Sequence, residues 1–340
     1  MAEITVDKIR TLASLALQGQ GLPTVAADEI AEEMAIAEYM GIKTHGIGKL
    51  VSLNLGDLTA EPDFIGEGPI FRVDGKGGNG FLVLRAVAEM LVERTKTFGI
   101  ALATISNTTR YSSLFPYPAK VAKEKLIGIL MNSAGPPAVA PFGSIDPVTG
   151  TNPICISFQT TDSVHSFDLA TSEIVWGEIR QAALEGRRLP SGPFLNTAGD
   201  VTSDPTEVNA VKVFGGPKGS AINVAIEILS GILGGGKVGA QCETEFDCGA
   251  FFLSIDPNSL GISSTTFSEN LERLFTEIRN SRPVSIDRKI RVAGDRGRSS
   301  VDIETILKEE VSVPQPILDM LGRMASGEDV SELASNPLFN

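Results

Sequence analysis

Residues 69–80, PIFRVDGKGGNG, decide the fold class, because a strand-like apolar run leads into a glycine-rich turn and then into a helix pattern from Phe81 to about Lys96. The glycines match G-x-G-x-x-G, a pattern that brings a helix N-terminus to the pyrophosphate of a dinucleotide. A dinucleotide fold also places an acidic residue at the end of the next strand, where this chain reads Ile105-Ser106-Asn107-Thr108-Thr109-Arg110. Arg110 suits a 2′-phosphate instead, but the sequence favours the plainer interpretation of a glycine turn that feeds a packed helix.

The rest of the chain mixes strands and helices without regular βαβ alternation. Apolar residues at a helical period predict helices over 5–20 and 24–41, with Thr24 as the N-cap of the second. Residues 134–153 and 186–220 are expected to be loops. This order indicates an α+β fold or a mixed sheet rather than a regular parallel one. Further helices are expected at about 116–125, 172–185, 220–233, 266–281, 302–309 and 314–326, and strands at 100–105, 126–131, 154–159, 164–169, 249–255 and 288–292.

Composition excludes several classes of partner. The net charge is −13 over 340 residues, whereas binding to nucleic acid or to an anionic membrane needs clustered Lys and Arg. No run approaches the ~20 apolar residues of a membrane span, and the first residues lack the apolar core of a signal peptide. Cys155, Cys242 and Cys248 are too few and too scattered for a disulfide framework or a metal site. We therefore expect a cytoplasmic protein that binds no metal, no nucleic acid and no membrane.

The run Lys43-Thr44-His45-Gly46-Ile47-Gly48-Lys49-Leu50 is where we expect the chemistry. Thr44 is a suitable N-cap, which would put His45 at the first position of a helix running to about Leu55. Lys49 lies four residues on and would share a helical face with His45. A proton donor and a cation would then face one small anionic substrate. The alternative is that His45 stands at a helix start without any role in catalysis. The second histidine, His165, lies in an apparent strand and is expected to be structural.

Two segments stand directly before predicted helices, where unbonded amides suit a phosphate group. Asp168-Leu169-Ala170-Thr171-Ser172 joins a strand to a helix that Thr171 and Ser172 can cap, and the alternative is a capped helix without a ligand. Gly215-Gly216-Pro217-Lys218-Gly219-Ser220 allows close backbone approach and offers one cation, but it lacks the residue order of a P-loop. The basic residues of 288–298 form either a ligand contact or a solvated face.

Taken in order, these motifs resemble the malate/L-lactate dehydrogenase family of NAD(P)-dependent oxidoreductases, which does not use the Rossmann fold. The resemblance covers nearly the whole chain. It implies an α+β fold with a mixed, largely antiparallel sheet flanked by helices, a small helical domain formed by both termini, and a homodimer with active sites at subunit and domain boundaries. The implied units are residues 1–62 packing with 300–340, a central or dimerisation region of 63–115 and 285–300, and an NAD(P)-binding domain of 116–284. The matching motifs are Thr44-His45-Gly46, Asp74-Gly75, Gly150-Thr151-Asn152-Pro153, Asp168–Ser172, Thr202-Ser203-Asp204-Pro205 and Gly215–Gly219.

The resemblance also assigns roles to residues. His45 matches the family's proton donor. Transfer of hydride from a nicotinamide to a C=O or C=N carbon leaves a negative charge that needs a proton, and a histidine suits that task near neutral pH. The cofactor contacts that the resemblance implies are Asp168, Leu169, Ala170, Thr171, Ser172, Pro217, Lys218, Gly294, Asp295 and Arg296.

Three positions depart from the family pattern. Lys49 stands where the family usually has Arg, so a bidentate fork becomes a point charge. Arg110 stands in a motif that usually has His, and we expect Lys49 and Arg110 to hold a substrate carboxylate. Asn196 stands in a motif that usually has Asp, which removes an anion able to orient His45 and raise its pKa.

The expected function is therefore an NAD(P)H-dependent reduction of a small 2-oxo acid. A cyclic imine is the alternative substrate, since an imine can arrive already protonated and then depends less on His45. The alternative outside the enzymes is a pseudoenzyme that binds the cofactor without turnover. Four spare cations, at Arg180, Arg187, Arg188 and Arg296, favour NADPH over NADH.

Overall fold

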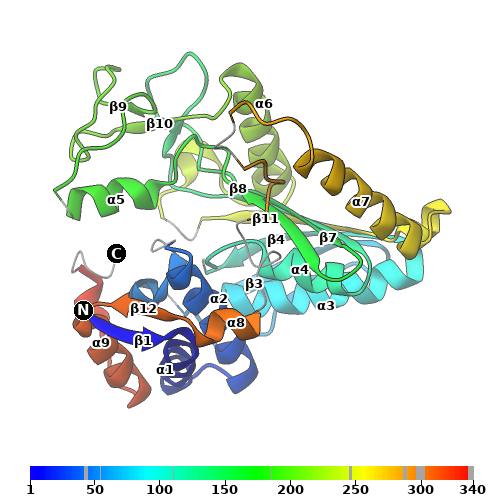
Figure 1. Cartoon of the computed structure of the whole chain (residues 1–340), viewed down its shortest axis with the longest axis horizontal. Helices are drawn as coiled ribbons and strands as arrows, with labels where there is room; N and C mark the ends of the chain where they lie inside the picture. Colours follow the sequence, from blue (N-terminus) through cyan, green and yellow to red (C-terminus); the bar gives the residue numbers. More distant parts are fainter. Residues whose placement is uncertain are drawn as a thin grey trace.

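The protein is described by a computed structural model that covers residues 1–41, 45–53, 55–109, 111–184, 186–244, 247–285, 289–295 and 303–335. Figure 1 shows a central sheet with helices packed on it and, beside it, a group of elements drawn from the two ends of the chain. Elements of the middle of the chain lie on the opposite side of the sheet from this group.

The central sheet is mixed and mostly antiparallel, as expected. Its strands lie in the order β2-β3-β4-β11-β5-β7-β8. β3 and β4 pair in parallel and are joined by helix α3 (Gly80–Phe98), whereas the other neighbours in this sheet pair antiparallel. The strands are β2 (Asp63–Ile65), β3 (Ile70–Gly78), β4 (Ile100–Thr108), β5 (Ile127–Ser133), β7 (Ile154–Gln159), β8 (Val164–Leu169) and β11 (Gly249–Ile255).

The glycine-rich turn packs against the chain's own backbone. Asn79 caps α3 by accepting a hydrogen bond from the Leu82 amide at 3.1 Å. A Cβ at Gly75 would lie 2.7 Å from the Asn107 carbonyl oxygen, and one at Gly80 would lie 2.2 Å from that of Thr109. These glycines therefore let β3 and α3 approach β4 and the residue that follows it. The interpretation of 75–80 as a turn that feeds a packed helix agrees with this geometry.

Both ends of the chain build one unit, the terminal unit. β1 (Ala2–Thr5) pairs antiparallel with β12 (Glu310–Val313), and α1 (Val6–Gly19) packs on α2 (Thr24–Tyr39) and on α9 (Gln315–Ala325). α8 (Ile303–Lys308) and the 3-10 helix η7 (Ser331–Ser335) complete the unit. The predicted domain boundaries stay predictions, although the small helical domain of both termini is present.

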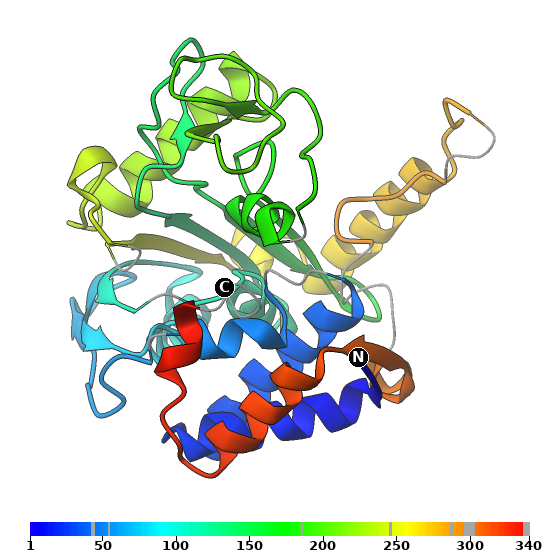
Figure 2. The same ribbon diagram turned by 90° about the vertical axis from the view of Figure 1, so that its left-hand side faces the viewer.

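A smaller sheet lies among the predicted loops. It has the order β6 (Val139–Ala140), β10 (Ala210–Lys212) and β9 (Phe194–Leu195), with α5 (Trp176–Leu184) packed beside it. α6 (Pro217–Ile226) continues into a π-helix, η3 (Glu227–Ile232), and short 3-10 helices follow at η4 (Gly239–Gln241) and η5 (Pro257–Leu260). Figure 2 shows α7 (Ser264–Arg279) projecting away from the body of the molecule.

One hydrophobic core connects the terminal unit with the central sheet. It includes Met34 of α2, Leu91 of α3, Leu130 of β5 and Phe252 of β11, all fully buried. Each such side chain contributes on the order of 1.5–3 kcal/mol by leaving water. α3 and α4 (Pro116–Lys123) pack on the strands of the sheet, while η3 contacts β5 and β11. The terminal unit is thus held to the sheet by a shared core.

Some local predictions are wrong. Thr24 is the first residue of α2 rather than its cap, because Pro23 occupies the N-cap position. Residues 289–292 form no strand, since the Val292 amide donates to the Asp295 carboxylate at 2.7 Å and the chain turns there. The segment 186–220 contains β9 and β10, whose two and three residues are too short for a periodic signal.

Close packing of α1 on α9 gives a testable prediction. Gly19→Ala is expected to lower the free energy of unfolding by about 2 kcal/mol, because its Cβ would lie 2.2 Å from the backbone oxygen of Met324. Gly322→Ala, on the exposed side of α9, is the matched control. Its Cβ would meet nothing within 4 Å, and alanine favours the helix by up to about 1 kcal/mol. Urea denaturation measures both, and equal effects of the two substitutions would contradict the close approach.

Candidate active site

His45 lies directly before a 3-10 helix. Gly46 is the N-cap of η2 (Ile47–Ser52), and the Lys49 amide donates to the Gly46 carbonyl at 3.0 Å. Ile47 and Leu50 are buried, whereas His45 and Lys49 are half-buried. η2 packs on α2 and also contacts α9 and η7. The histidine is therefore carried by the terminal unit.

The predicted α-helix over 45–55 is wrong. Two glycines, Gly46 and Gly48, weaken an α-helix, and burial of Ile47 with Leu50 at a spacing of three suits the tighter 3-10 geometry. His45 precedes the N-cap Gly46, whose backbone is extended, so His45 is not part of η2. The shared helical face of His45 and Lys49 is therefore not formed. Their roles in proton donation and carboxylate binding stay predictions, and Thr44 and Arg110 lie outside the described residues.

Thr171 joins three of the motifs in a buried hydrogen-bond network. Its amide and hydroxyl donate to the Thr151 carbonyl at 2.9 and 3.0 Å. Its carbonyl accepts from the Phe214 amide at 3.0 Å, and its hydroxyl oxygen accepts from the Asn223 side chain at 2.9 Å. Segments 150–153, 168–172 and 213–219 thus meet at the end of β8.

Thr171 and Ser172 do not cap α5, contrary to the prediction. α5 begins at Trp176 rather than at about 172. Thr171 is held by the 151–152 carbonyls, and Ser172 forms an antiparallel bridge with Val213. These contacts tie both residues to the start of α6 instead.

The start of α6 suits a phosphate group. Gly215 and Gly216 have φ of +60° and +61°, a left-handed conformation that favours glycine, and nothing lies within 4 Å of a Cβ at Gly215. Lys218 is exposed in the first turn. The Ser172 hydroxyl is buried nearby without a hydrogen-bond partner among the described residues. Helix amides, one ammonium group and a buried hydroxyl together fit the phosphates of a dinucleotide.

Two carboxylates hold the segment before α4, that of the buried Glu33 and that of Asp168 near the exposed end of β8, and we call Glu33, Asp168 and residues 113–115 the carboxylate clamp. Asp168 accepts from the amides of Leu114 and Phe115 at 3.2 and 3.0 Å. Glu33 of α2 accepts from the Ser113 hydroxyl and amide. Burial raises the pKa of Glu33 to about 7, although the Ser113 hydrogen bonds lower it, and burial raises the pKa of Asp168 to about 6.

The segment 293–295 lies against β8. A Cβ at Gly294 would lie 2.5 Å from the Ser166 carbonyl oxygen. Asp295 pairs with Arg279 of α7 at 2.7 Å, and this hydrogen-bonded guanidinium holds the pKa of Asp295 below its usual range. Gly294 and Asp295 therefore reach the strand that leads into 168–172. Arg296 lies outside the described residues.

His165 has a structural environment, as the sequence suggested. It is buried in β8, its Nε2 donates to the Ala293 carbonyl, and its ring packs on Phe167 and Phe275. Asn196 has a local role as well, because its side-chain oxygen accepts from the amides of Ala198 and Asp200 at 3.0 and 2.9 Å. Whether Asn196 also meets a substrate stays a prediction.

Sequence reasoning missed the buried polar contacts that support the site, although Asn152 stands in the matched motif at 150–153. Asn152 is fully buried at φ +36° and donates to the Glu227 carboxylate at 2.7 Å. The sequence analysis predicts no role for Glu33, although it lies three residues after Ile30 on the apolar stripe of α2. Glu38 lies four residues after Met34 on the same stripe. A charged residue on a buried helical stripe is the signal that would have found both glutamates.

Two kinds of feature are absent from the described ranges. No helix there is long and apolar enough to cross a membrane. Nor do three or more His, Cys, Asp or Glu side chains of these ranges gather as they would around a metal ion.

The mixed, mostly antiparallel sheet is not the doubly wound parallel sheet of a Rossmann domain. The structure of delta1-piperideine-2-carboxylate reductase from Pseudomonas syringae superposes with a TM-score of 0.79 at 26% identity, over 95% of this chain and 100% of that one. The model of the malate/L-lactate dehydrogenase family matches residues 4–321. The chain belongs to that family and is an oxidoreductase, and the dehydrogenase class implies a nicotinamide cofactor.

Two curated relatives carry different names. L-sulfolactate dehydrogenase of Methanocaldococcus jannaschii is 31% identical over 277 residues, which cover 77% of this chain and 80% of that protein. Delta(1)-pyrroline-2-carboxylate reductase 1 of Burkholderia ambifaria is 34% identical over 240 residues, which cover 68% of this chain and 70% of that protein. The family resemblance noted in the sequence is thereby confirmed.

The carboxylate clamp predicts how stability depends on pH. Because the Glu33 pKa is raised from 4.5 to about 7, the folded state holds more protons than the unfolded state between these values. Stability is therefore expected to fall as pH rises from about 4.5 to about 7, with Asp168 adding to the fall below about 6. Glu33→Gln should raise the free energy of unfolding at pH 8 by on the order of 2 kcal/mol and flatten the decline.

Chemical denaturation of wild type and Glu33→Gln at a series of pH values measures this effect. Glu29→Gln is the control, since Glu29 lies on the same helix with its side chain 54% exposed and pairs only loosely with Arg85, at 3.7 Å. It should change stability by less than about 0.5 kcal/mol. Parallel curves for wild type and Glu33→Gln would show that Glu33 is not the group that titrates.

Proposed function

We propose that this protein is an NAD(P)H-dependent reductase that transfers hydride to a small 2-oxo acid. The observation that carries the proposal is the meeting of segments 150–153, 168–172 and 213–219 around Thr171, beside a helix start suited to phosphate. Relatives named as dehydrogenases of hydroxy acids support the substrate class. The bound nicotinamide would supply the hydride.

We assign the cofactor to three neighbouring segments. Leu169 to Ser172, Pro217 with Lys218, and Gly294 with Asp295 would hold it, and Arg296 belongs to the same proposal. The Lys218 ammonium and the α6 amides would neutralise phosphate charge. Asp168 would act by fixing the end of β8, because its carboxylate already accepts two amides of the clamp.

His45 is assigned as the proton donor. It would give its proton to the oxygen on which negative charge develops, and Lys49 and Arg110 would hold the substrate carboxylate. Lys49 offers a single ammonium group rather than the two-pronged contact of an arginine. Asn196 would complete the substrate side without adding a charge.

A cyclic imine carboxylate is the second candidate substrate. The pyrroline-2-carboxylate reductase relative, 34% identical, supports it. So does Asn196, because a neutral amide gives His45 no help as an acid, and an imine already protonated needs less of it. A cofactor-binding protein without turnover is the third candidate and would be shown by tight binding with no reaction.

We propose NADPH as the preferred cofactor. Arg180 is exposed on α5, and Arg188 donates to the Ser203 hydroxyl at 3.2 Å, so both leave charge for a 2′-phosphate. Arg187 supports this less, because it pairs with Glu178 at 2.9 Å.

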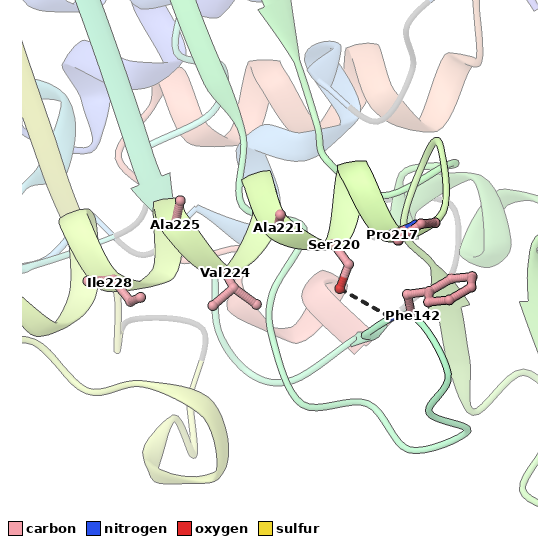
Figure 3. A pocket seen from close by; sticks show the side chains of 7 residues that line it. All are labelled: Phe142, Pro217, Ser220, Ala221, Val224, Ala225 and Ile228. Carbon is pink, nitrogen blue, oxygen red and sulfur yellow. Dashed lines mark hydrogen bonds between the residues drawn. The ribbon is translucent and has the colours of Figure 1, made fainter.

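We propose a homodimer that covers an apolar face of α6 and η3. Figure 3 shows Ser220, Val224 and Ile228 projecting from one side of the helix, with Phe142 next to them. Val224, Ile228 and Ile232 are 39%, 47% and 59% exposed, and Phe142 is 65% exposed. An apolar stripe of this extent favours a second copy of the chain over water.

A cytoplasmic location stays a proposal. It is supported by the free thiols of Cys155 and Cys242, which suit a reducing compartment. Cell fractionation tests it.

The central test is steady-state oxidation of NADPH and NADH over a panel of 2-oxo acids, each with and without an amine that forms the imine. We expect turnover with NADPH at a higher kcat/KM than with NADH. His45→Asn should lower ketone turnover by about 10² to 10⁴-fold while the Kd for NADPH, measured by fluorescence, stays within about twofold.

Asn196→Asp is the matched variant for substrate choice. It should raise ketone turnover relative to imine turnover, because it restores an anion near the acid. Full ketone turnover by His45→Asn would refute the proton donor, and tight NADPH binding without any turnover would favour the pseudoenzyme.

The dimer has a separate test. Ile228→Asp is expected to shift wild-type dimers to monomers in sedimentation velocity, because it buries a charge in the apolar stripe. Val25→Asp, at a position 57% exposed on α2, is the control and should leave the dimer intact. A monomeric wild type would refute the dimer. A dimeric Ile228→Asp variant would show that the interface lies elsewhere.

A further inference from the structure

Glu38 holds the backbone next to His45. Its carboxylate oxygen Oε2 accepts a hydrogen bond from the Ile47 amide at 3.3 Å, and the residue is only 8% exposed. Ile47 is fully buried and begins η2 directly after Gly46. The hydrogen bond therefore fixes the chain two residues beyond the imidazole.

The position of Glu38 is costly for a carboxylate. It lies in the last turn of α2, where the helix dipole disfavours negative charge. Burial adds the cost of removing the charge from water. A neutral apolar residue would fit the stripe of α2 at lower free energy, so packing alone does not account for a glutamate here.

We propose that Glu38 is a positioning residue for His45, which orients the imidazole through the Ile47 amide and favours its protonated form through its negative charge. This inference rests on the proposed role of His45 as proton donor. Asn196 provides no charge for this task, and Glu38 supplies the anion from a different element.

The other charged groups near η2 either oppose Glu38 or have partners of their own. Lys49 is the cation of η2 itself and would oppose the effect of Glu38. On the neighbouring elements, Arg323 of α9 pairs with Glu332 of η7 at 2.7 Å, and Asp319 accepts from Gln315 at 2.9 Å. On α2, Glu33 belongs to the carboxylate clamp and faces Ser113. Glu38 is thus the carboxylate with a described hydrogen bond to the His45 segment.

The test uses the fact that the chain has two histidines. Full-length protein with ¹³C-labelled histidine gives two ring signals, and His45→Asn identifies the signal of His45. The midpoint pH of its titration is then measured in wild type, Glu38→Gln and Glu33→Gln. Glutamine can still accept from the Ile47 amide, so Glu38→Gln removes the charge and keeps the hydrogen bond.

We expect Glu38→Gln to lower the midpoint by roughly half a pH unit or more, as loss of one nearby charge predicts. Glu33→Gln, which removes a buried carboxylate five residues earlier on the same helix, should leave the midpoint unchanged. An unchanged midpoint in Glu38→Gln, or equal shifts in both variants, would overturn the proposal.

Kinetics supply the second readout. The alkaline limb of kcat/KM should move with the NMR midpoint in Glu38→Gln, and Glu38→Asp should restore it in part. Glu38→Ala should lower kcat by about 10-fold or more and leave the Kd for NADPH unchanged, because the Ile47 amide loses the hydrogen bond that positions the backbone next to His45. Wild-type kcat and an unshifted profile in Glu38→Ala would count against it. A shifted midpoint together with full turnover by His45→Asn would support the coupling of Glu38 to His45 and reject only the proton-donor role.

Discussion

The hydrogen bonds of one buried residue, Thr171, hold the candidate cofactor region together. The residue has no exposed surface, and its amide, hydroxyl and carbonyl all have partners in segments distant in sequence. Such a network is strong because each polar group is satisfied where water cannot compete. The end of β8, the 150–153 loop and the start of α6 are therefore positioned as one body. The phosphate-suited helix start depends on that arrangement.

Much of the sheet could be predicted from the sequence, because its strands carry their own signals. The limits of β7 and β8 agree with the predicted 154–159 and 164–169, and β11 with 249–255. The sequence does not predict β1 and β12, because strands of four residues carry little periodic signal and form only by pairing with each other across some 300 residues. The sequence predicts an α-helix where the 3-10 helix at Ile47 lies, because tertiary burial, rather than propensity, selects its geometry.

The sequence predicts the motifs of the site but not the buried hydrogen bonds that hold them in place. The residues of segments 150–153, 168–172 and 215–219 indicate a site. The sequence predicts a helix cap at Thr171, however, because its real partners, Thr151 and Asn223, are remote in the chain. Local sequence cannot show which of several possible acceptors a hydroxyl will meet. Glu33 and Glu38 of α2 are detectable from the sequence, because each places a charge at a position where the helical spacing of α2 predicts an apolar residue.

The pairing of β1 with β12 has a consequence for the order in which the site matures. His45 is made early, but the elements against which η2 rests, α9 and η7, lie after residue 314. A growing chain on the ribosome can thus complete the β8 region and its helix start well before its final segment is available to close the terminal unit. The cofactor side is assembled from the middle of the chain, and the proposed acid, although among the first residues synthesised, is the last to be secured.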